Sequence, residues 1–141
     1  MELFSRDDLP AGAARRGSTR TILAVDDSRT NLNVLGRRLA HLGYLVVLSD
    51  NGHEALDLIA ARGFDMVLLD MVMPGMSGLH VLNEIRGNRE TADLPVIMVT
   101  GRSDAGAAIA ALAAGADDNA AKPFAFQLLA ARTDPGIDRA R

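Results

Sequence analysis

One stretch of the chain, residues 64–78, has the sequence FDMVLLDMVMPGMSG. It contains an unbroken apolar run from Met66 to Leu69, which has the length of a strand and ends at a single carboxylate, Asp70. A strand without polar alternation is typical of a parallel sheet that is covered on both faces. Sites in such sheets lie just beyond the carboxyl ends of the strands. A lone aspartate at a strand end more often starts a turn or helix, so its role depends on the rest of the chain.

The bulk properties of the chain are those of one globular domain. Its 141 residues include 48% hydrophobic residues, which is enough to bury a single core. The net charge of −3 comes without the basic cluster that nucleic-acid binding requires. The chain lacks cysteine, which excludes disulfides and cysteine-based zinc sites. It also lacks a membrane-length apolar run and a secretory signal. We therefore expect a cytoplasmic protein with no membrane contact and no direct nucleic-acid contact.

Strand patterns alternate with helical patterns along the chain. Further strands are expected at residues 22–25, 45–48 and 96–99, with a weak, loosely held one at about 117–121. Helices are expected after a cap at Ser28 or Thr30 and after one at Ser77, as well as at about 55–62, 104–114 and 125–132. In the fourth helix, which is rich in alanine, Ile109 and Leu112 are expected to face the core.

Five alternations of strand and helix predict an α/β fold with a doubly wound, five-stranded parallel sheet and helices on both faces. Right-handed crossovers favour the strand order 2-1-3-4-5 in a three-layer α/β/α arrangement. This order makes the first and third strands neighbours, so Asp26, Asp27 and Asp70 are expected to converge at one crevice. Thr100 and Lys122, at the ends of the fourth and fifth strands, would border it.

Three converging carboxylates require a cation or a proton. Two unit charges about 4 Å apart repel by roughly 4 kcal/mol at an effective dielectric constant of about 20. An all-oxygen donor set selects a hard ion, and Mg²⁺ fits best because it tolerates few protein ligands. A carboxylate beside Mg²⁺ can attack a phosphoryl group and form an acyl phosphate. Lys122 would add positive charge and Thr100 a hydroxyl. Each residue alone has a commoner structural explanation, but the set is specific.

Together these motifs resemble the receiver domain of response regulators in two-component signal transduction, a member of the CheY-like superfamily. The resemblance rests on Asp26-Asp27, Asp70 with MPGMSG at residues 73–78, Thr100, and KPF at residues 122–124. It covers residues 20–133 and implies a flavodoxin-like fold with five helices. Residues 1–19 would then be a flexible N-terminal arm, and residues 134–141 a C-terminal tail or the start of a linker.

The resemblance also implies roles for single residues. Asp70 matches the phosphoacceptor, which takes a phosphoryl group from a sensor histidine kinase or a phosphotransfer protein. Mg²⁺ would be held by Asp27, Asp26, Asp70 and the backbone carbonyl of Val72. Thr100 and Lys122 match the switch residues that bind the phosphoryl oxygens. Such a domain is regulatory rather than a metabolic enzyme, although it assists its own phosphorylation and dephosphorylation.

In this family the fourth helix, fifth strand and fifth helix form the face that contacts an output domain, a protein partner or a second copy. Here that face is alanine-rich and short. Asn119 stands three residues before the lysine, where the family has an aromatic residue that moves with the threonine, so the usual readout of the switch is not expected. Val72 and Arg102 occupy the two positions that tune phosphoryl lifetime. Because valine cannot hydrogen-bond a water molecule, slow self-dephosphorylation is expected.

Two other functions match parts of the pattern. A receiver-like interaction module that signals without phosphorylation would explain Asn119 and the weak strand at 117–121. A hydrolase with an aspartate nucleophile, like the haloacid dehalogenase-like phosphatases, needs a second aspartate two residues later, where this chain has Val72. The presence of Asp70, Asp27 and Lys122 together favours the phosphoacceptor.

Overall fold

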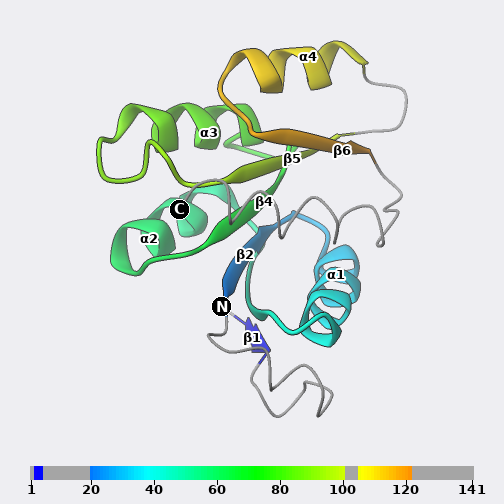
Figure 1. The fold of residues 1–141 in the computed structure, drawn as a ribbon. Coiled ribbons are helices and arrows are strands. Elements are labelled where there is room, and N and C mark those ends of the chain that lie inside the picture. The colour runs from blue at the N-terminus through cyan, green and yellow to red at the C-terminus, as the bar shows by residue number, and fades with distance from the viewer. Residues whose placement is uncertain (1, 5–19, 101–104, 122–141) are drawn as a thin grey trace.

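The structure is a computed structural model that describes residues 2–4, 20–100 and 105–121. In this part of the chain a central sheet is flanked by helices (Figure 1). The elements in chain order are β1 (Glu2–Phe4), β2 (Thr21–Val25), α1 (Arg29–His41), β3 (Leu45–Ser49), α2 (Gly52–Ala61), β4 (Met66–Asp70), α3 (Gly78–Gly87), β5 (Val96–Thr100), α4 (Ala105–Ala113) and β6 (Asp118–Ala121). Among the described helices, none has the length and hydrophobicity that crossing a bilayer requires.

The sheet has the order β1-β3-β2-β4-β5-β6. Its five parallel strands therefore follow the predicted order 2-1-3-4-5, which is confirmed. β2 lies between β3 and β4, and Val25 near its end pairs with Ser49 on one side and Leu69 on the other. The carboxyl ends of these three strands consequently lie side by side. The helix predicted at residues 125–132 falls outside the described residues.

β1 was not expected from the sequence, which predicts only an arm over residues 1–19. Residues Glu2–Phe4 instead pair antiparallel with β3, in a register that runs from Glu2↔Leu48 to Phe4↔Val46. Three residues are too few to show a hydrophobic period. The strand forms because the outer edge of β3 offers backbone groups for pairing. Residues 2–4 alone therefore could not predict it, because the pairing partner is a distant part of the chain.

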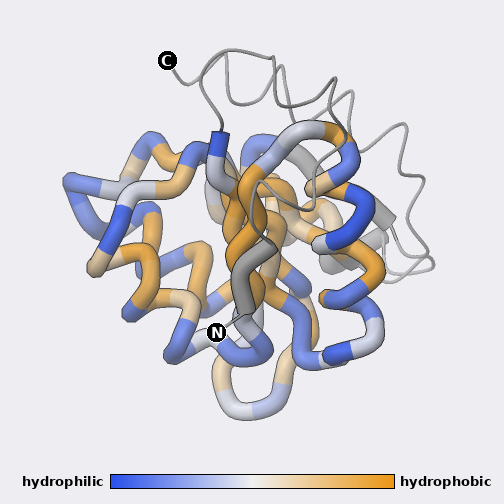
Figure 2. Tube along the Cα trace, turned by 90° about the horizontal axis from the view of Figure 1, so that it is seen from below, coloured by the Kyte–Doolittle hydropathy of each residue, from blue (hydrophilic) through white to orange (hydrophobic). Residues whose placement is uncertain are grey.

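Two hydrophobic cores cover the two faces of the sheet. Successive strand residues point to opposite faces, so Ile22 and Ala24 pack with α1, whereas Leu23 and Val25 belong to the core beneath α2, α3 and α4. Figure 1 shows α1 on one side of the sheet and α2 and α3 on the other. Figure 2 shows the apolar strands at the centre and hydrophilic residues at the periphery. The predicted three-layer arrangement is thus confirmed.

Local signals set most of the helix ends. The side chains of Ser28 and Ser77 accept hydrogen bonds from backbone N–H groups in the first turns of α1 and α3, as predicted. Asn51, for which the sequence predicts no capping role, caps α2 in the same way. Gly43 follows α1 with φ of 101°, a left-handed conformation that favours glycine at a helix end.

The orientation predicted for α4 is wrong. Ile109 is 69% exposed and Leu112 is 51% exposed, whereas Ala111 is fully buried. At 3.6 residues per turn, Ile109 lies about 200° around the helix from Ala111, so the two cannot face the same side. The helix has an alanine stripe and a stripe of larger residues. The structure packs the alanine stripe on the sheet, which leaves the larger residues in solvent.

We predict opposite outcomes for two isoleucine-to-alanine substitutions on helices. Ile85→Ala in α3 is expected to lower the free energy of unfolding by about 2–5 kcal/mol, because Ile85 is 1% exposed and its loss opens a cavity. Ile109→Ala in α4 is expected to change it by less than about 0.5 kcal/mol. Urea unfolding measures both values, and a large loss for Ile109→Ala would contradict the observed face of α4.

Candidate functional site: a cluster of three aspartates

Three aspartates meet at the carboxyl end of the central strands. Asp26 follows β2 directly, and Asp70 is the last residue of β4. Because β2 and β4 pair in parallel, these ends are adjacent. One carboxylate oxygen from each of Asp26, Asp27 and Asp70 lies within 4.8 Å of the others. The predicted convergence is therefore confirmed among the residues that the structure describes.

Asp26 is held by backbone groups of two neighbouring elements. Its N–H donates to the carbonyl of Ser49 over 3.1 Å, and its Oδ1 accepts from the N–H of Ser28 over 2.9 Å. Only 3% of the residue is exposed. Part of its role is thus to satisfy a backbone N–H group before α1. Its carboxylate still faces the other two.

Asp70 is fixed by the loop of residues 71–78, which follows it. The N–H of Met71 donates to the carbonyl of Val99 over 2.9 Å, and the carbonyl of Met71 accepts from the N–H of Gly78 over 2.9 Å. A Cβ atom at Gly78 would collide with the carbonyl group of Asp70. Gly75 has φ of 79°, in the left-handed region. The glycines let the loop fold back against the end of β4, and Asp70 is 4% exposed as a result.

The close approach at Gly78 was missed in the sequence. A glycine at the first position of a helix, directly after the capping Ser77, was the available signal, because helix geometry does not require glycine there.

The donor set fits a single hard cation. Two ligands on opposite sides of one Mg²⁺ are about 4.2 Å apart, and the three oxygens lie within 4.8 Å of one another. Small side-chain rotations would therefore bring them to one ion. Asp27 is exposed, so the cluster opens to solvent on its side. Val72, two residues beyond Asp70, is 70% exposed.

The other predicted site residues are placed in part. Thr100 ends β5 and pairs with Ala121, while its neighbour Val99 pairs with Asp70. The ends of β4, β5 and β6 are thus in register beside the cluster. Asn119 lies in β6 opposite Met98. Lys122 and Arg102 fall outside the described residues.

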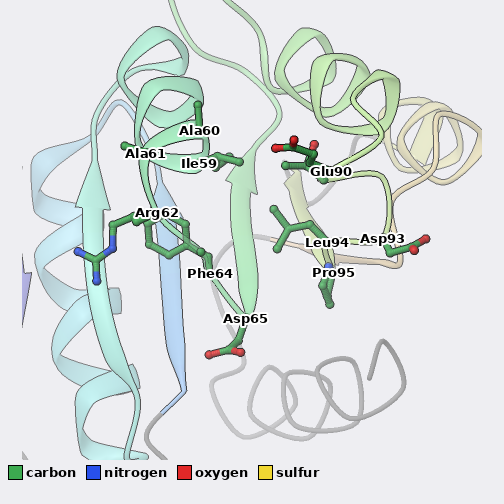
Figure 3. Close-up of a pocket in the computed structure, with 12 residues that line it drawn as sticks. Ile59, Ala60, Ala61, Arg62, Phe64, Asp65, Glu90, Asp93, Leu94 and Pro95 are labelled. Carbon is green, nitrogen blue, oxygen red and sulfur yellow. The ribbon is translucent and has the colours of Figure 1, made fainter.

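A hollow of about 460 Å³ lies at the other end of the sheet (Figure 3). Its lining includes Asp65 and Pro95, which directly precede β4 and β5. The amino ends of parallel strands lie opposite their carboxyl ends, so this hollow is remote from the three aspartates. Arg62 covers the ring of Phe64 there, with its guanidinium carbon 5.5 Å from the ring centre. The hollow contributes nothing to the acidic site.

Two glycines of α3 provide a matched test of the loop. Gly78→Ala is expected to lower the free energy of unfolding by about 1–3 kcal/mol, because the new methyl group meets the backbone of Asp70 and Met71. Gly87→Ala, where the space around the new methyl group is open, is expected to raise it by up to about 1 kcal/mol. Urea denaturation distinguishes the two, and equal effects would contradict the close approach.

Comparison with known proteins places the chain in a family. Residues 22–134 match the response regulator receiver domain family. The response regulators MprA of Mycolicibacterium vanbaalenii and Mycobacterium tuberculosis are 45% and 44% identical to it over 111 residues. These alignments cover 79% of this chain and 47% of each relative. The chain therefore spans about half the length of the curated relatives it matches.

Solved structures agree with the sequence matches. A protein described as a response regulator from Chloroflexus aurantiacus superposes with a TM-score of 0.84 and 35% identity, covering 86% of this chain and 100% of that one. The receiver domain of the sensor histidine kinase PA1611 from Pseudomonas aeruginosa, with a magnesium ion coordinated in its active site cleft, has a TM-score of 0.79 and 30% identity. That alignment covers 86% of this chain and 99% of that domain. The chain belongs to the response regulator receiver domain family of two-component signal transduction, whose members are regulatory, bind Mg²⁺ and are switched by phosphorylation.

Proposed function

We propose that this chain accepts a phosphoryl group on Asp70, in a Mg²⁺-dependent reaction, from a sensor histidine kinase or a phosphotransfer protein. The observation that carries the proposal is the convergence of Asp26, Asp27 and Asp70 at one end of the sheet. Nothing in ordinary folding requires three carboxylates to be so close, since their repulsion opposes it. A bound cation that takes part in phosphoryl transfer would explain why the three carboxylates lie together.

Asp70 is the nucleophile that the geometry favours. Asp26 has one oxygen engaged by the N–H of Ser28, and Asp27 lies on the solvent side. Asp70 is buried at the end of a buried strand and is held in place by the loop behind it. A fixed position is what an in-line displacement needs.

In the proposed step, a carboxylate oxygen of Asp70 attacks the phosphorus atom of a phosphohistidine. The new O–P bond forms as the N–P bond breaks, and the imidazole leaves with the electron pair of the broken bond. The product is an acyl phosphate on Asp70. Mg²⁺ held by Asp26, Asp27, Asp70 and the carbonyl of Val72 would offset the charge on the phosphoryl oxygens. The Thr100 hydroxyl and the Lys122 ammonium would bind those oxygens from the neighbouring strand ends.

The outer face of α4 is the proposed contact for an output domain, a protein partner or a second copy. Ile109 and Leu112 project from it into solvent, and α4 packs beside β6, the edge strand of the described sheet. Exposed large apolar residues on one helix face favour a protein contact. Because Asn119 stands in β6 in place of an aromatic residue, we propose that the switch is read through movement of α4 rather than through an aromatic side chain.

The phosphoacceptor chemistry can be tested by incubation with acetyl phosphate and Mg²⁺, read by intact mass. The wild-type chain is expected to gain one phosphoryl adduct, and removal of Mg²⁺ by a chelator should abolish it. Asp70→Asn should gain none, because an amide oxygen is a poor nucleophile. Asp27→Asn should gain little, because one metal ligand is lost.

Two outcomes would count against this function. An adduct that persists in Asp70→Asn would place the reaction elsewhere. A wild-type chain that binds Mg²⁺ and stays unmodified by both acetyl phosphate and a phosphorylated kinase would favour a phosphorylation-independent interaction module.

The phosphoryl group on Asp70 is expected to be lost slowly in the wild type. Val72 offers no donor or acceptor that could orient an attacking water. In Val72→Asn, one hydrogen bond of about 1.4 kcal/mol to that water would speed the loss about tenfold. The exposed Val34 of α1 provides the control, as Val34→Asn should leave the rate unchanged. Decay of the adduct by intact mass gives the rates, and a wild-type half-life of seconds would contradict the expectation.

A further inference from the structure

Arg86, in the last turn of α3, binds the two connections that lead into β5 and β6 at the amino end of the sheet. Its Nε donates to the carbonyl of Gly115 over 2.8 Å, and its Nη1 donates to the carbonyls of Leu94 over 2.7 Å and Ala92 over 3.1 Å. Its Nη2 donates to Oδ2 of Asp117 over 2.9 Å. The guanidinium thus directs N–H groups from all three of its nitrogens at the connections that lead into β5 and β6. Its side chain is 19% exposed.

Asp117 connects this cation to the sheet. Its N–H donates to the carbonyl of Val96 over 2.9 Å, and its Oδ2 accepts from the N–H of Val96 over 2.8 Å. Main chain and side chain of Asp117 therefore satisfy both backbone groups of the first residue of β5. The regular pairing of β5 with β6 begins one residue later, at Ile97↔Asp118. Asp117 consequently determines where that pairing starts.

The residues of β6 themselves specify their register weakly. The strand reads DNAA and contains no large apolar residue, and all of its residue types are depleted in strands. Register is normally set by a hydrophobic pattern that places one set of side chains in the core, and strands without such a pattern are prone to slip. The register of β6 must therefore be set by contacts outside the strand.

We propose that Arg86 and Asp117 form a register clamp for β6, and that through it they position Lys122, the residue after the strand, for phosphoryl transfer to Asp70. Both are positioning residues, because their contacts lie at the opposite end of the strand from the aspartates. The inference rests on the proposed function of Asp70 and Lys122. A slip of one residue would move the end of β6 by about 3.3 Å, which exceeds the tolerance of a hydrogen bond.

The ladder gives the clamp a direct path to the site. Asp70 of β4 pairs with Val99 of β5, and Val99 pairs with Ala120 of β6. Fixing Asp117 at the start of β6 thus fixes its end relative to the phosphoacceptor strand. Gly115 makes room for the clamp, since a Cβ atom there would lie 3.2 Å from Cγ of Arg86.

The test compares Arg86→Met with Arg89→Met, which removes an exposed arginine just beyond the same helix. Arg86→Met is expected to slow phosphorylation by acetyl phosphate about ten- to a hundredfold, as a misplaced group near the reacting atoms would. Mg²⁺ affinity by calorimetry should stay unchanged, because the proposed ligands lie on other strands. Arg89→Met should match the wild type in both measurements. Arg86→Lys should recover only part of the rate, because lysine lacks the planar fork that reaches both connections at once.

A double-mutant cycle with Lys122→Ala separates positioning from general weakening. If the clamp acts through Lys122, Arg86→Met should slow the Lys122→Ala protein by less than about twofold further. An equal loss of rate in both backgrounds, or a parallel loss of Mg²⁺ affinity, would overturn the inference. Asp117→Asn, which keeps the shape of the side chain, repeats the test if Arg86→Met fails to fold.

Amide hydrogen exchange distinguishes this inference from the proposed function. Exchange at residues 118–121 should accelerate in Arg86→Met while residues 22–25 of β2 stay protected. If the wild type accepts no phosphoryl group, the proposed function fails, and the exchange result alone then shows whether Arg86 and Asp117 hold the register of β6. Unchanged protection in β6 would overturn it.

Discussion

The parallel pairing of β2 with β4 is the contact on which the site depends. Both strands are buried on both faces, so neither can shift by one residue without moving its whole apolar set to the wrong face. Their register is therefore strongly specified by burial. Because Asp26 directly follows β2 and Asp70 is the last residue of β4, the same burial that stabilises the sheet brings the two aspartates together. The free energy that overcomes the repulsion of the carboxylates comes from the hydrophobic core.

The strands of the sheet differ in how strongly their own residues specify their register. β2 and β4 are specified by their own apolar residues, whereas β6 depends on contacts made by residues before it. β1 pairs with the outer edge of β3 over just three residues. The register of the strands that carry the aspartates is thus the most strongly specified by burial, and the register at the edge beside α4 is less strongly specified. A regulatory domain benefits from this arrangement, because its chemistry needs a fixed nucleophile and its output needs an element that can move.

Loop chemistry completes the site in a way that neither strand could. After Asp70 the chain turns back, and Gly78 allows its own backbone to lie against the end of β4. Ser77 caps α3 at the same point, so one short segment ends the loop and starts the helix. The strands and the aspartate cluster could be predicted because each follows from a local period or a strand-end position, and the strand order followed from the handedness of the crossovers. The roles assigned to Thr100, Lys122 and Arg102 stay predictions.

The sequence by itself determined the alternation of strands and helices, their order in the parallel sheet and the identity of the clustered acids. The alternation and the acids depend on hydrophobic period and on positions at strand ends, which are local properties of the chain, and the strand order follows from the handedness of the crossovers. Only the tertiary structure decided the pairing of β1, the inward face of α4 and the contacts of Arg86. Arg86 meets Gly115 and Asp117 at separations of 29 and 31 residues, and α4 could bury either of two stripes on its surface. These features depend on which surfaces meet in the folded chain. The residues that form those surfaces lie far apart in the sequence, so no local pattern predicts the contact.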